Sequence, residues 1–356
     1  MRVRETGIRI GTGEAGPLGG ITDVPGVRVG QATVVAGDTV RTGVTVVLPH
    51  DDDPGVQGVF AGFHRLNGNG EMTGIHWIRE FGVLSTPVAL TNTHSVGVVR
   101  DALAAASPSG VQAWSLPVVA ETWDGHLNDI GGMHVRAEHV AAALSAASSG
   151  PVPEGNVGGG TGMICHGFKG GTGTASRVLD ETDGGYTVGV LVQANHGRRE
   201  RFRVDGAPVG TILTGERVPL PSAPAGPRGG SIIGVVATDA PLLPHQCDRL
   251  AQRAALGVAR AGGAGEQSSG DLFLAFSTGN RVAAAAGPPL ALRMLPDAST
   301  DPLSYAVIEA TEEAVVSALL SARTMTGRGG ATAHALTVDE LREAVEAVGR
   351  RTGVDR

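Results

Sequence analysis

The sequence predicts an α/β fold in which β-sheets pack on one another and helices cover them. Several short runs are apolar at nearly every position rather than alternating, as in strands that are covered on both faces. The segments between them carry apolar residues every three or four positions, which is typical of helices that bury one face. The chain also contains 55 glycines, which stand among Val, Ile, Leu and Thr and so indicate tight turns and close backbone contacts within a sheet-rich fold.

The predicted elements follow one another along the whole chain. Runs of β-branched and other apolar residues predict strands at 26–35 (GVRVGQATVV), 42–49 (TGVTVVLP), 86–93 (TPVALTNT), 186–195 (YTVGVLVQAN), 231–240 (SIIGVVATDA) and 270–278 (GDLFLAFST). Apolar residues at helical spacing predict helices at 74–84, 134–147, 244–262 and 305–324. Only the Pro- and Gly-rich segment 218–230 has the composition of a boundary loop. We therefore predict a single domain over 1–356.

The charge and the two cysteines narrow the class of protein. Lys and Arg number 28 against 35 Asp and Glu, a net charge of −7, so no basic surface for nucleic acid or an anionic membrane is expected. No secretory signal and no run of about eighteen apolar residues is found, from which we expect a cytoplasmic protein that binds a small molecule or further copies of itself. Cys165 and Cys247 have neither disulfide nor metal spacing and are expected to be buried, reduced thiols.

Ser231 stands where the loop at 218–230 ends and an apolar strand begins. The two glycines before it allow backbone conformations that other residues avoid, and its hydroxyl adjoins the carbonyl of Gly230. Attack on that carbonyl would shift the acyl group from nitrogen to oxygen, and hydrolysis would free an α-amine whose pKa of about 7.7–8.0 suits a base. From these residues alone, the alternative is a turn that merely starts a strand.

Motifs in order along nearly the whole chain resemble those of the self-processing L-aminopeptidase/D-amidase/esterases and β-aminopeptidases. They lie at 21–33, 41–50, 66–74, 88–97, 118–129, 154–163, 168–177, 188–197, 230–246, 269–278 and 309–320. The resemblance implies a four-layer α/β/β/α sandwich, similar to but topologically distinct from that of other N-terminal-nucleophile hydrolases. It also implies cofactor-free catalysis, a homo-oligomer that is a tetramer of αβ units, and self-cleavage between Gly230 and Ser231 into an α chain 1–230 and a β chain 231–356.

The resemblance assigns roles to residues of a catalytic centre. Ser231 matches the nucleophile, and Asn195 matches an asparagine that donates to the oxyanion. Ser269 and Asp271 match the family's second serine and its acidic residue. Two positions apart in an extended strand, they would point to the same face and could hold the proton of Ser231. Without the resemblance, Ser269 and Asp271 would be interpreted as capping a turn, and Asn195 as an ordinary turn residue.

Two further positions concern the substrate. Glu121 matches a glutamate near the substrate's amino end, where a carboxylate would pair with a free ammonium group. Trp123 stands where the family commonly has a tyrosine, and an indole is larger and donates a hydrogen bond but cannot act as an acid. Asp271 is a milder departure, since the family more often has glutamate there. His196 has no counterpart in the family pattern and is interpreted as a solvent-exposed or loop histidine.

The predicted function is removal of N-terminal residues (α, β or D) from short peptides, amides or esters through an acyl-Ser231 intermediate. One alternative is an acyltransferase or amide-oligomer hydrolase with the same fold. Another is an uncut, non-catalytic protein that binds nucleotides at the glycine-rich motifs 154–163 and 168–177. Against it, Lys169 precedes its glycines, whereas a phosphate-binding P-loop has the lysine after them. The acidic segment 49–55 is interpreted as a solvated turn, and no metal site is predicted.

Overall fold

Strand β11, Ser231–Thr238, shows why the predicted strands are apolar throughout. The computed structural model describes residues 3–107, 114–222 and 230–352, and in it both faces of this strand are covered. Ile232 and Val236 belong to a core shared with helices, whereas Ile233 and Val235 belong to a core between two sheets. Because side chains alternate between the faces of a strand, a strand with a core on each side is apolar at every position.

β11 lies inside the larger of the two sheets, whose strands in the described residues follow the order β4-β3-β12-β11-β10-β9. β11 runs parallel to β12 and antiparallel to β10, and the other pairs of this sheet are antiparallel. Ser231 therefore begins a strand that has a neighbour on each side. The other strands are β3 (Gln57–Gly68), β4 (Val83–Leu84), β9 (Gly171–Val178), β10 (Thr187–Asn195) and β12 (Gly270–Ala283).

The smaller sheet packs on the larger one through an apolar layer. Its strands follow the order β1-β2-β5-β6, and β5 runs parallel to β6. Their bounds are β1 Arg28–Ala36, β2 Val40–Leu48, β5 Val88–Asn92 and β6 Val118–Thr122. Two short hairpins stand apart from both sheets, β7 (Ile164–Cys165) with β8 (Phe168–Lys169) and β13 (Met325–Thr326) with β14 (Thr332–Ala333).

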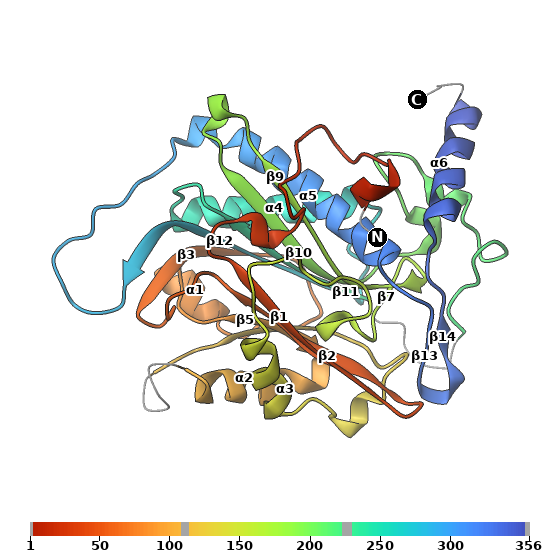
Figure 1. Ribbon diagram of the computed structural model, residues 1–356, viewed down its shortest axis with the longest axis horizontal. Helices are drawn as coiled ribbons and strands as arrows, with labels where there is room; N and C mark the ends of the chain where they lie inside the picture. The colour runs from red at the N-terminus through yellow and green to blue at the C-terminus, as the bar shows by residue number, and fades with distance from the viewer. Residues whose placement is uncertain (1–2, 108–113, 223–229, 353–356) are drawn as a thin grey trace.

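Helices cover the outer face of each sheet (Figure 1). α4 (Pro244–Arg260) and α5 (Asp301–Leu320) share a core with the larger sheet. α2 (Val96–Ala105) and α3 (Ala137–Ser145) share another with the smaller sheet. α1 (Ile75–Phe81) packs near β3, and α6 (Val338–Thr352) stands at one edge of the molecule. The layers are thus α/β/β/α, as predicted.

Two glycines let the outer helices approach the sheets closely. A Cβ atom on Gly173 of β9 would lie 1.9 Å from the carbonyl oxygen of Ala314 in α5. A Cβ atom on Gly30 of β1 would lie 1.9 Å from the carbonyl oxygen of Ala143 in α3. Real Cβ atoms do not come so near a backbone oxygen, so a larger residue at either position would push the helix away. These contacts confirm that glycine serves close packing in this fold.

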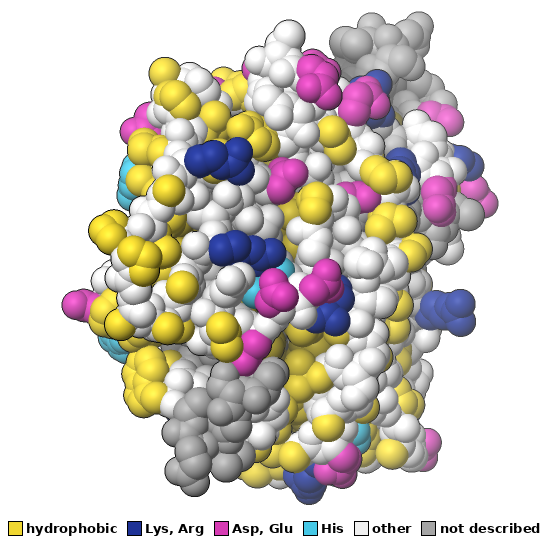
Figure 2. Space-filling view, turned by 60° about the vertical axis from the view of Figure 1, so that its left-hand side comes forward, with side chains coloured by type: hydrophobic (Ala, Val, Ile, Leu, Met, Phe, Trp, Pro, Cys, Tyr) yellow, Lys and Arg dark blue, Asp and Glu magenta, His cyan; other side chains and the backbone are white. Residues whose placement is uncertain are grey.

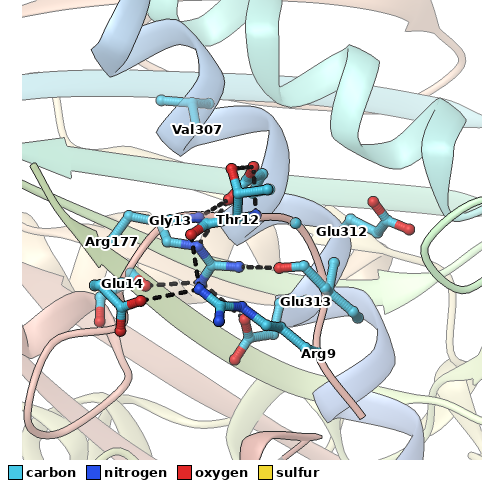
Figure 3. A network of polar contacts seen from close by, with 12 residues as sticks. Arg9, Thr12, Gly13, Glu14, Arg177, Val307, Glu312 and Glu313 are labelled. Carbon is cyan, nitrogen blue, oxygen red and sulfur yellow. Dashed lines mark hydrogen bonds and ion pairs between the residues drawn. The ribbon is translucent and has the colours of Figure 1, made fainter. Parts of the chain in front are cut away.

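A buried polar cluster fastens the N-terminal segment to α5 (Figure 3). Arg177 of β9 is 2% exposed, and its guanidinium pairs with Glu309 at 3.2 Å and with Glu313 at 2.8 Å. Glu309 also accepts hydrogen bonds from the backbone N–H groups of Thr12 and Gly13, at 3.0 and 2.9 Å. Burial alone would raise the pKa of Glu309, but these hydrogen bonds and Arg177 outweigh burial and lower it.

All the predicted strands and helices are present, with shifted ends. The helix expected at 74–84 is shorter, Ile75–Phe81, because the backbones of Gly74 and Gly82 are left-handed at its two ends. Val83 and Leu84, predicted as the end of that helix, form strand β4 instead. Strands β3, β6 and β9, the short strands β7, β8, β13 and β14, and helices α2 and α6 were not predicted. Of the predicted loop at 218–230, residues 223–229 lie outside the described part of the chain. Within the described residues, no helix is long and apolar enough to span a membrane.

Candidate active site

Three strand ends meet at Ser231. As the first residue of β11, it is in register with Asn195, the last residue of β10, and with Gly270, the first residue of β12. Ser269 and Asp271 flank Gly270 and therefore lie at the same edge of the sheet. Antiparallel pairing on one side and parallel pairing on the other thus bring together four predicted catalytic residues that are distant in the sequence.

The Ser231 hydroxyl faces the peptide group that precedes it. Ser231 is 4% exposed, and its Oγ donates a hydrogen bond of 2.6 Å to the carbonyl oxygen of Gly230. The backbone N–H of Gly270 lies 3.2 Å from the same carbonyl oxygen and 3.3 Å from Ser231 Oγ. A hydroxyl and a backbone N–H therefore both contact the carbonyl oxygen of Gly230. The sequence analysis did not identify this backbone donor.

Ser269 and Asp271 form a hydrogen-bonded pair beside this peptide group. Ser269 Oγ donates to Asp271 Oδ1 at 2.6 Å, which confirms that the two side chains share a face. A Cβ atom on Gly230 would lie 3.6 Å from Ser269 Oγ, so the pair borders the Gly230–Ser231 junction. Burial, with a further contribution from nearby Glu266, raises the pKa of Asp271 to about 6. Asp271 can therefore exchange a proton near neutral pH.

Both polar atoms of the Asn195 side-chain amide form hydrogen bonds in this structure. Its Oδ1 accepts a hydrogen bond from the backbone N–H of Ile164 at 2.8 Å, and its Nδ2 donates to the carbonyl oxygen of Trp123 at 2.9 Å. Nδ2 has a second hydrogen, which leaves one donor for an oxyanion. The structure places Asn195 beside Ser231, and its role as an oxyanion donor stays a prediction.

Glu121 reaches the same region from the smaller sheet. Its Oε1 accepts the backbone N–H of Glu71 at 2.9 Å, and its Oε2 accepts the hydroxyl of Thr93. A Cβ atom on Gly70 would lie 3.1 Å from Glu121 Oε1 and 3.2 Å from the Cα of Gly270, so this carboxylate approaches the start of β12. Glu121 is 3% exposed, and burial raises its pKa despite the two hydrogen bonds.

A cavity of about 330 Å³ opens next to the Gly230–Ser231 junction. Trp123, Asn195 and Gly230 line it, which places the predicted substrate residue Trp123 in its wall. Glu266, which the sequence analysis missed, also lines it, and its Oε1 is buried with no hydrogen-bond partner among the described residues. One oxygen of a cavity-lining carboxylate thus lacks a hydrogen-bond partner in the described part of the chain. Sequence alone gave no signal for it, because Glu266 lies in a glycine-rich loop.

Two further predictions concern His196 and Lys169. His196 lies in the loop after β10, as one part of its interpretation expects, but it is not solvent-exposed, because it is 3% exposed and burial holds its pKa well below the usual value. The rejection of phosphate binding at Lys169 agrees with the structure. The Lys169 ammonium is buried and donates to three backbone carbonyls, those of Gly160, Met163 and Gly170, at 3.4, 2.8 and 2.8 Å.

Comparison with known proteins connects this geometry to one family. The family model described as peptidase family S58 matches residues 19–333. Over 361 residues the chain is 48% identical to a beta-peptidyl aminopeptidase, BapA of Sphingosinicella microcystinivorans, covering 96% of this chain and 91% of the relative. It is 43% identical over 369 residues to BapA of Sphingosinicella xenopeptidilytica, covering 97% of this chain and 91% of the relative.

Solved structures agree with the sequence matches. A β-aminopeptidase from a Burkholderia species superposes with a TM-score of 0.92 at 52% identity, covering 98% of this chain and 99% of that one. The L-aminopeptidase D-Ala-esterase/amidase of Ochrobactrum anthropi, described as a prototype for the serine aminopeptidases and a new variant among the Ntn hydrolase fold, gives 0.88 at 43% identity and covers 99% of both chains. The predicted fold is thereby confirmed.

Proposed function

The chain belongs to peptidase family S58 and is an aminopeptidase of the N-terminal-nucleophile class, and on this premise we propose that it cuts itself before Ser231 and then removes N-terminal residues from short substrates. The observation that carries the proposal is the peptide group before Ser231. Its carbonyl oxygen lies 2.6 Å from Ser231 Oγ and also contacts the Gly270 N–H. The proposed nucleophile, the peptide bond that it would cut and a candidate oxyanion donor are thus adjacent.

Self-cleavage begins when Ser231 Oγ attacks the carbonyl carbon of Gly230. The Oγ–C bond forms, the Gly270 N–H stabilises the negative oxygen, and the hydroxyl proton passes by way of Ser269 and Asp271 to the departing nitrogen of Ser231. Water then hydrolyses the ester, which frees the carboxylate of Gly230 and restores the hydroxyl. The products are chains 1–230 and 231–356, and Ser231 now carries an α-amine.

Turnover repeats this chemistry on a substrate. The α-amine of Ser231, with an ordinary pKa of about 7.7–8.0, accepts the hydroxyl proton and later returns it to the leaving group. The substrate carbonyl takes the position vacated by that of Gly230, so the Gly270 N–H and the free hydrogen of Asn195 Nδ2 stabilise its oxyanion. No cofactor is required for these steps.

Two carboxylates are available for the free amine of the substrate. Glu121 approaches from the smaller sheet with both oxygens hydrogen-bonded, and Glu266 lines the cavity with one oxygen unpaired. A substrate whose amine lies one carbon farther from its carbonyl, as in a β-amino acid, would reach a carboxylate set back from Ser231. The beta-peptidyl aminopeptidase relatives agree with N-terminal β-residues as substrates. We therefore propose short peptides, amides and esters of small N-terminal residues, β-alanine included.

Denaturing electrophoresis tests self-cleavage. Wild-type protein is expected to give two fragments, the smaller beginning SIIGVV, whereas Ser231→Ala gives one full-length band and no activity. A full-length wild-type band that stays intact while the protein hydrolyses substrate would overturn the nucleophile assignment. Aminoacyl p-nitroanilides with α-, β- and D-residues then define the substrate, and added amines reveal transfer to an acceptor other than water.

Matched glutamine variants test recognition of the amine. Glu121→Gln and Glu266→Gln are each compared on substrates with free and N-acylated amines. Loss of the carboxylate that pairs with the ammonium should raise KM for the free-amine substrate by more than tenfold, which corresponds to about 1.4 kcal/mol. The KM for the N-acylated substrate should stay unchanged in that variant. If neither variant distinguishes the two substrates, ammonium recognition by these carboxylates is wrong.

We also propose that the protein is a homo-oligomer. Leu290, Leu292 and Met294, in the loop between β12 and α5, are 49%, 45% and 45% exposed. Figure 1 shows this loop extending away from the body, and Figure 2 shows hydrophobic side chains on the side of the molecule that carries it. Exposed apolar residues on a projecting loop are typical of contacts between subunits. Sedimentation of the wild type and of a Leu290→Ser, Leu292→Ser double variant tests this, and an unchanged monomer in both contradicts it.

A cytoplasmic location is proposed from the two thiols. Cys165 and Cys247 are buried and unpaired, as expected in a reducing compartment. Fractionation of the native cells, with a periplasmic marker as the control, checks this location.

A further inference from the structure

A buried cluster of one thiol and two imidazoles lies behind the end of β10. Cys165 ends β7, His166 follows it in the turn, and His196 follows the last residue of β10. Their exposed fractions are 0%, 0% and 3%. One potential ligand atom from each residue lies within 4.8 Å of the other two. None of the three has a part in the proposed reaction.

The hydrogen bonds around the two imidazoles leave nitrogen atoms without a partner. His166 Nδ1 lies 3.2 Å from the carbonyl oxygen of Arg198, so Nδ1 carries the proton and Nε2 keeps its lone pair. His196 Nδ1 lies 3.7 Å from Cys165 Sγ. Among the described residues, Nε2 of His166 and Nε2 of His196 have no hydrogen-bond partner, although both are buried. Buried polar atoms normally find partners, so two orphan nitrogens in one cluster point to a missing ligand.

The His166 ring is held in the form that binds metals, because its Nδ1 faces the carbonyl oxygen of Arg198 and its buried Nε2 has no partner among the described residues. A backbone carbonyl that fixes the tautomer from behind, as Arg198 does for His166, is the usual second partner of a metal-binding histidine. A thiolate and two neutral imidazoles are ligands that zinc prefers.

We propose that Cys165, His166 and His196 bind a thiophilic divalent metal ion, Zn²⁺ being the representative. On binding, the Cys165 S–H bond breaks, a sulfur–metal bond forms, and the proton leaves to solvent. Three protein ligands leave one position of a tetrahedral ion open. His196 also lines the 330 Å³ cavity beside Ser231, so the proposed site adjoins a space that could supply a water molecule as the fourth ligand.

Two cations near the cluster limit how tightly the ion binds. Lys169 directs its ammonium at three backbone carbonyls. Arg199 donates to the carbonyls of Leu213 and Val218 at 2.9 and 2.8 Å and stacks on the ring of Phe168. Lys169 is thus directed at backbone carbonyls, whereas Arg199 also donates from Nε to the carbonyl oxygen of His166 at 3.0 Å, and the thiolate cancels one charge of the ion. The repulsion that remains favours a weaker site than a closed structural zinc site.

The bound ion would join two segments that the fold already holds together. The backbone N–H of His166 donates to the carbonyl oxygen of His196 at 2.7 Å, and the N–H of Ile164 donates to the side chain of Asn195. A metal ion across the same gap would stiffen the strand end that carries Asn195. Metal binding is therefore expected to raise the melting temperature.

The test uses full-length protein without a histidine tag, treated with a chelator and titrated with Co²⁺. One Co²⁺ per chain is expected, with visible ligand-field bands and a near-ultraviolet sulfur-to-cobalt band that Zn²⁺ abolishes. Cys165→Ser should remove the sulfur band and weaken binding more than about 100-fold, the upper range for loss of a second-shell partner alone. Cys247→Ser, which removes the other buried thiol, should leave the spectrum unchanged.

The outcomes decide the proposal either way. His196→Gln should weaken binding as Cys165→Ser does, and circular dichroism of each variant shows whether it has folded. If wild-type protein gives no sulfur-to-cobalt band, the proposal is overturned without recourse to any variant. Retention of the band in folded Cys165→Ser protein overturns it as well, because the thiolate would then come from elsewhere.

Discussion

Two buried clusters of charged groups, one at Arg177 and one at Ser231, are built in opposite ways. At Arg177 the guanidinium is paired with two carboxylates and also donates to the backbone carbonyls of Ser176 and Ile10. At Ser231 the carboxyl of Asp271 has a neutral serine as its partner and Glu266 nearby, and burial raises its pKa to about 6. The first cluster satisfies its charges and holds the N-terminal segment in place. The second leaves charge unsatisfied, which makes proton transfer available near neutral pH.

Breaking the Arg177 cluster should have the largest effect on stability. Arg177→Gln leaves Glu309 and Glu313 without their cation and should lower the free energy of unfolding by about 3–5 kcal/mol. Urea denaturation in the uncut Ser231→Ala background measures it. Arg9→Gln, which breaks the exposed Arg9–Glu14 pair, is the control and should have no measurable effect. Equal losses in the two variants would contradict the comparison.

The loss of stability in Arg177→Gln should depend on pH, because it arises from the charge of Glu309. The pKa of Glu309 is lowered in the folded state, so its ionised form stabilises the protein above its usual pKa of about 4.5. This contribution is lost as pH falls through the lowered, folded-state pKa. The difference between Arg177→Gln and the parent protein should therefore shrink in acid, and a difference independent of pH would show that packing, not charge, holds the segment.

Removing the amide of Asn195 should affect turnover rather than stability. If Nδ2 stabilises the oxyanion, Asn195→Ala should lower kcat by about 10²–10³ with little change in KM. Gln193→Ala is the matched control, because this buried amide lies two residues earlier on β10 and bonds to Thr91 and Thr122, away from Ser231. A loss of kcat as large in the control would make Asn195 a structural residue.

Asp271→Asn should stabilise the protein while abolishing activity. The folded-state pKa of Asp271 is about 6 against 3.8 for the unconstrained group, so the unfolded state binds fewer protons in this window and stability falls as pH rises through it. The amide that replaces the carboxyl is neutral at every pH, so it avoids the free-energy cost of ionising a buried carboxyl group. At about pH 8, in the Ser231→Ala background, the gain should be about 1–2 kcal/mol, and it should vanish near pH 4. Asp101→Asn, on the surface, is the control, and a loss at both pH values would contradict the comparison.

Exchanging Trp123 for tyrosine should have the smallest effect. The indole narrows the cavity and its face can attract the substrate cation by about 0.5–2 kcal/mol. We expect wild-type protein to prefer small N-terminal residues and Trp123→Tyr to widen the range or raise activity several-fold. Kinetics on alanyl and phenylalanyl p-nitroanilides measure this. A wild-type preference for large aromatic residues would make Trp123 a core residue instead.

A feature of the fold or of the site could be predicted from the sequence where the residues that cause it lie within one segment of the chain. The strand after Ser231 and helix α4 were predicted because their apolar patterns lie within one segment. Helix α6 has apolar residues at 338, 341, 345 and 348, so the sequence did carry its signal. The burial of His196 was not predictable, because its sequence neighbours are typical of a turn and its burial depends on the distant segment at 164–166. The placement of Glu266 depends likewise on packing around a glycine-rich loop.

Strand order in the larger sheet has a consequence for the stability of the protein if it cleaves itself as proposed. β11 and β12 would belong to the smaller fragment, yet they lie between β3 on one side and β10 on the other, both from the larger fragment. The two fragments would be interleaved and could not part without opening the sheet on both sides. Refolding would then require two molecules to meet, whereas the uncut chain needs only itself. Self-cleavage would thus turn a protein that can recover from unfolding into one that is preserved mainly by how slowly it unfolds.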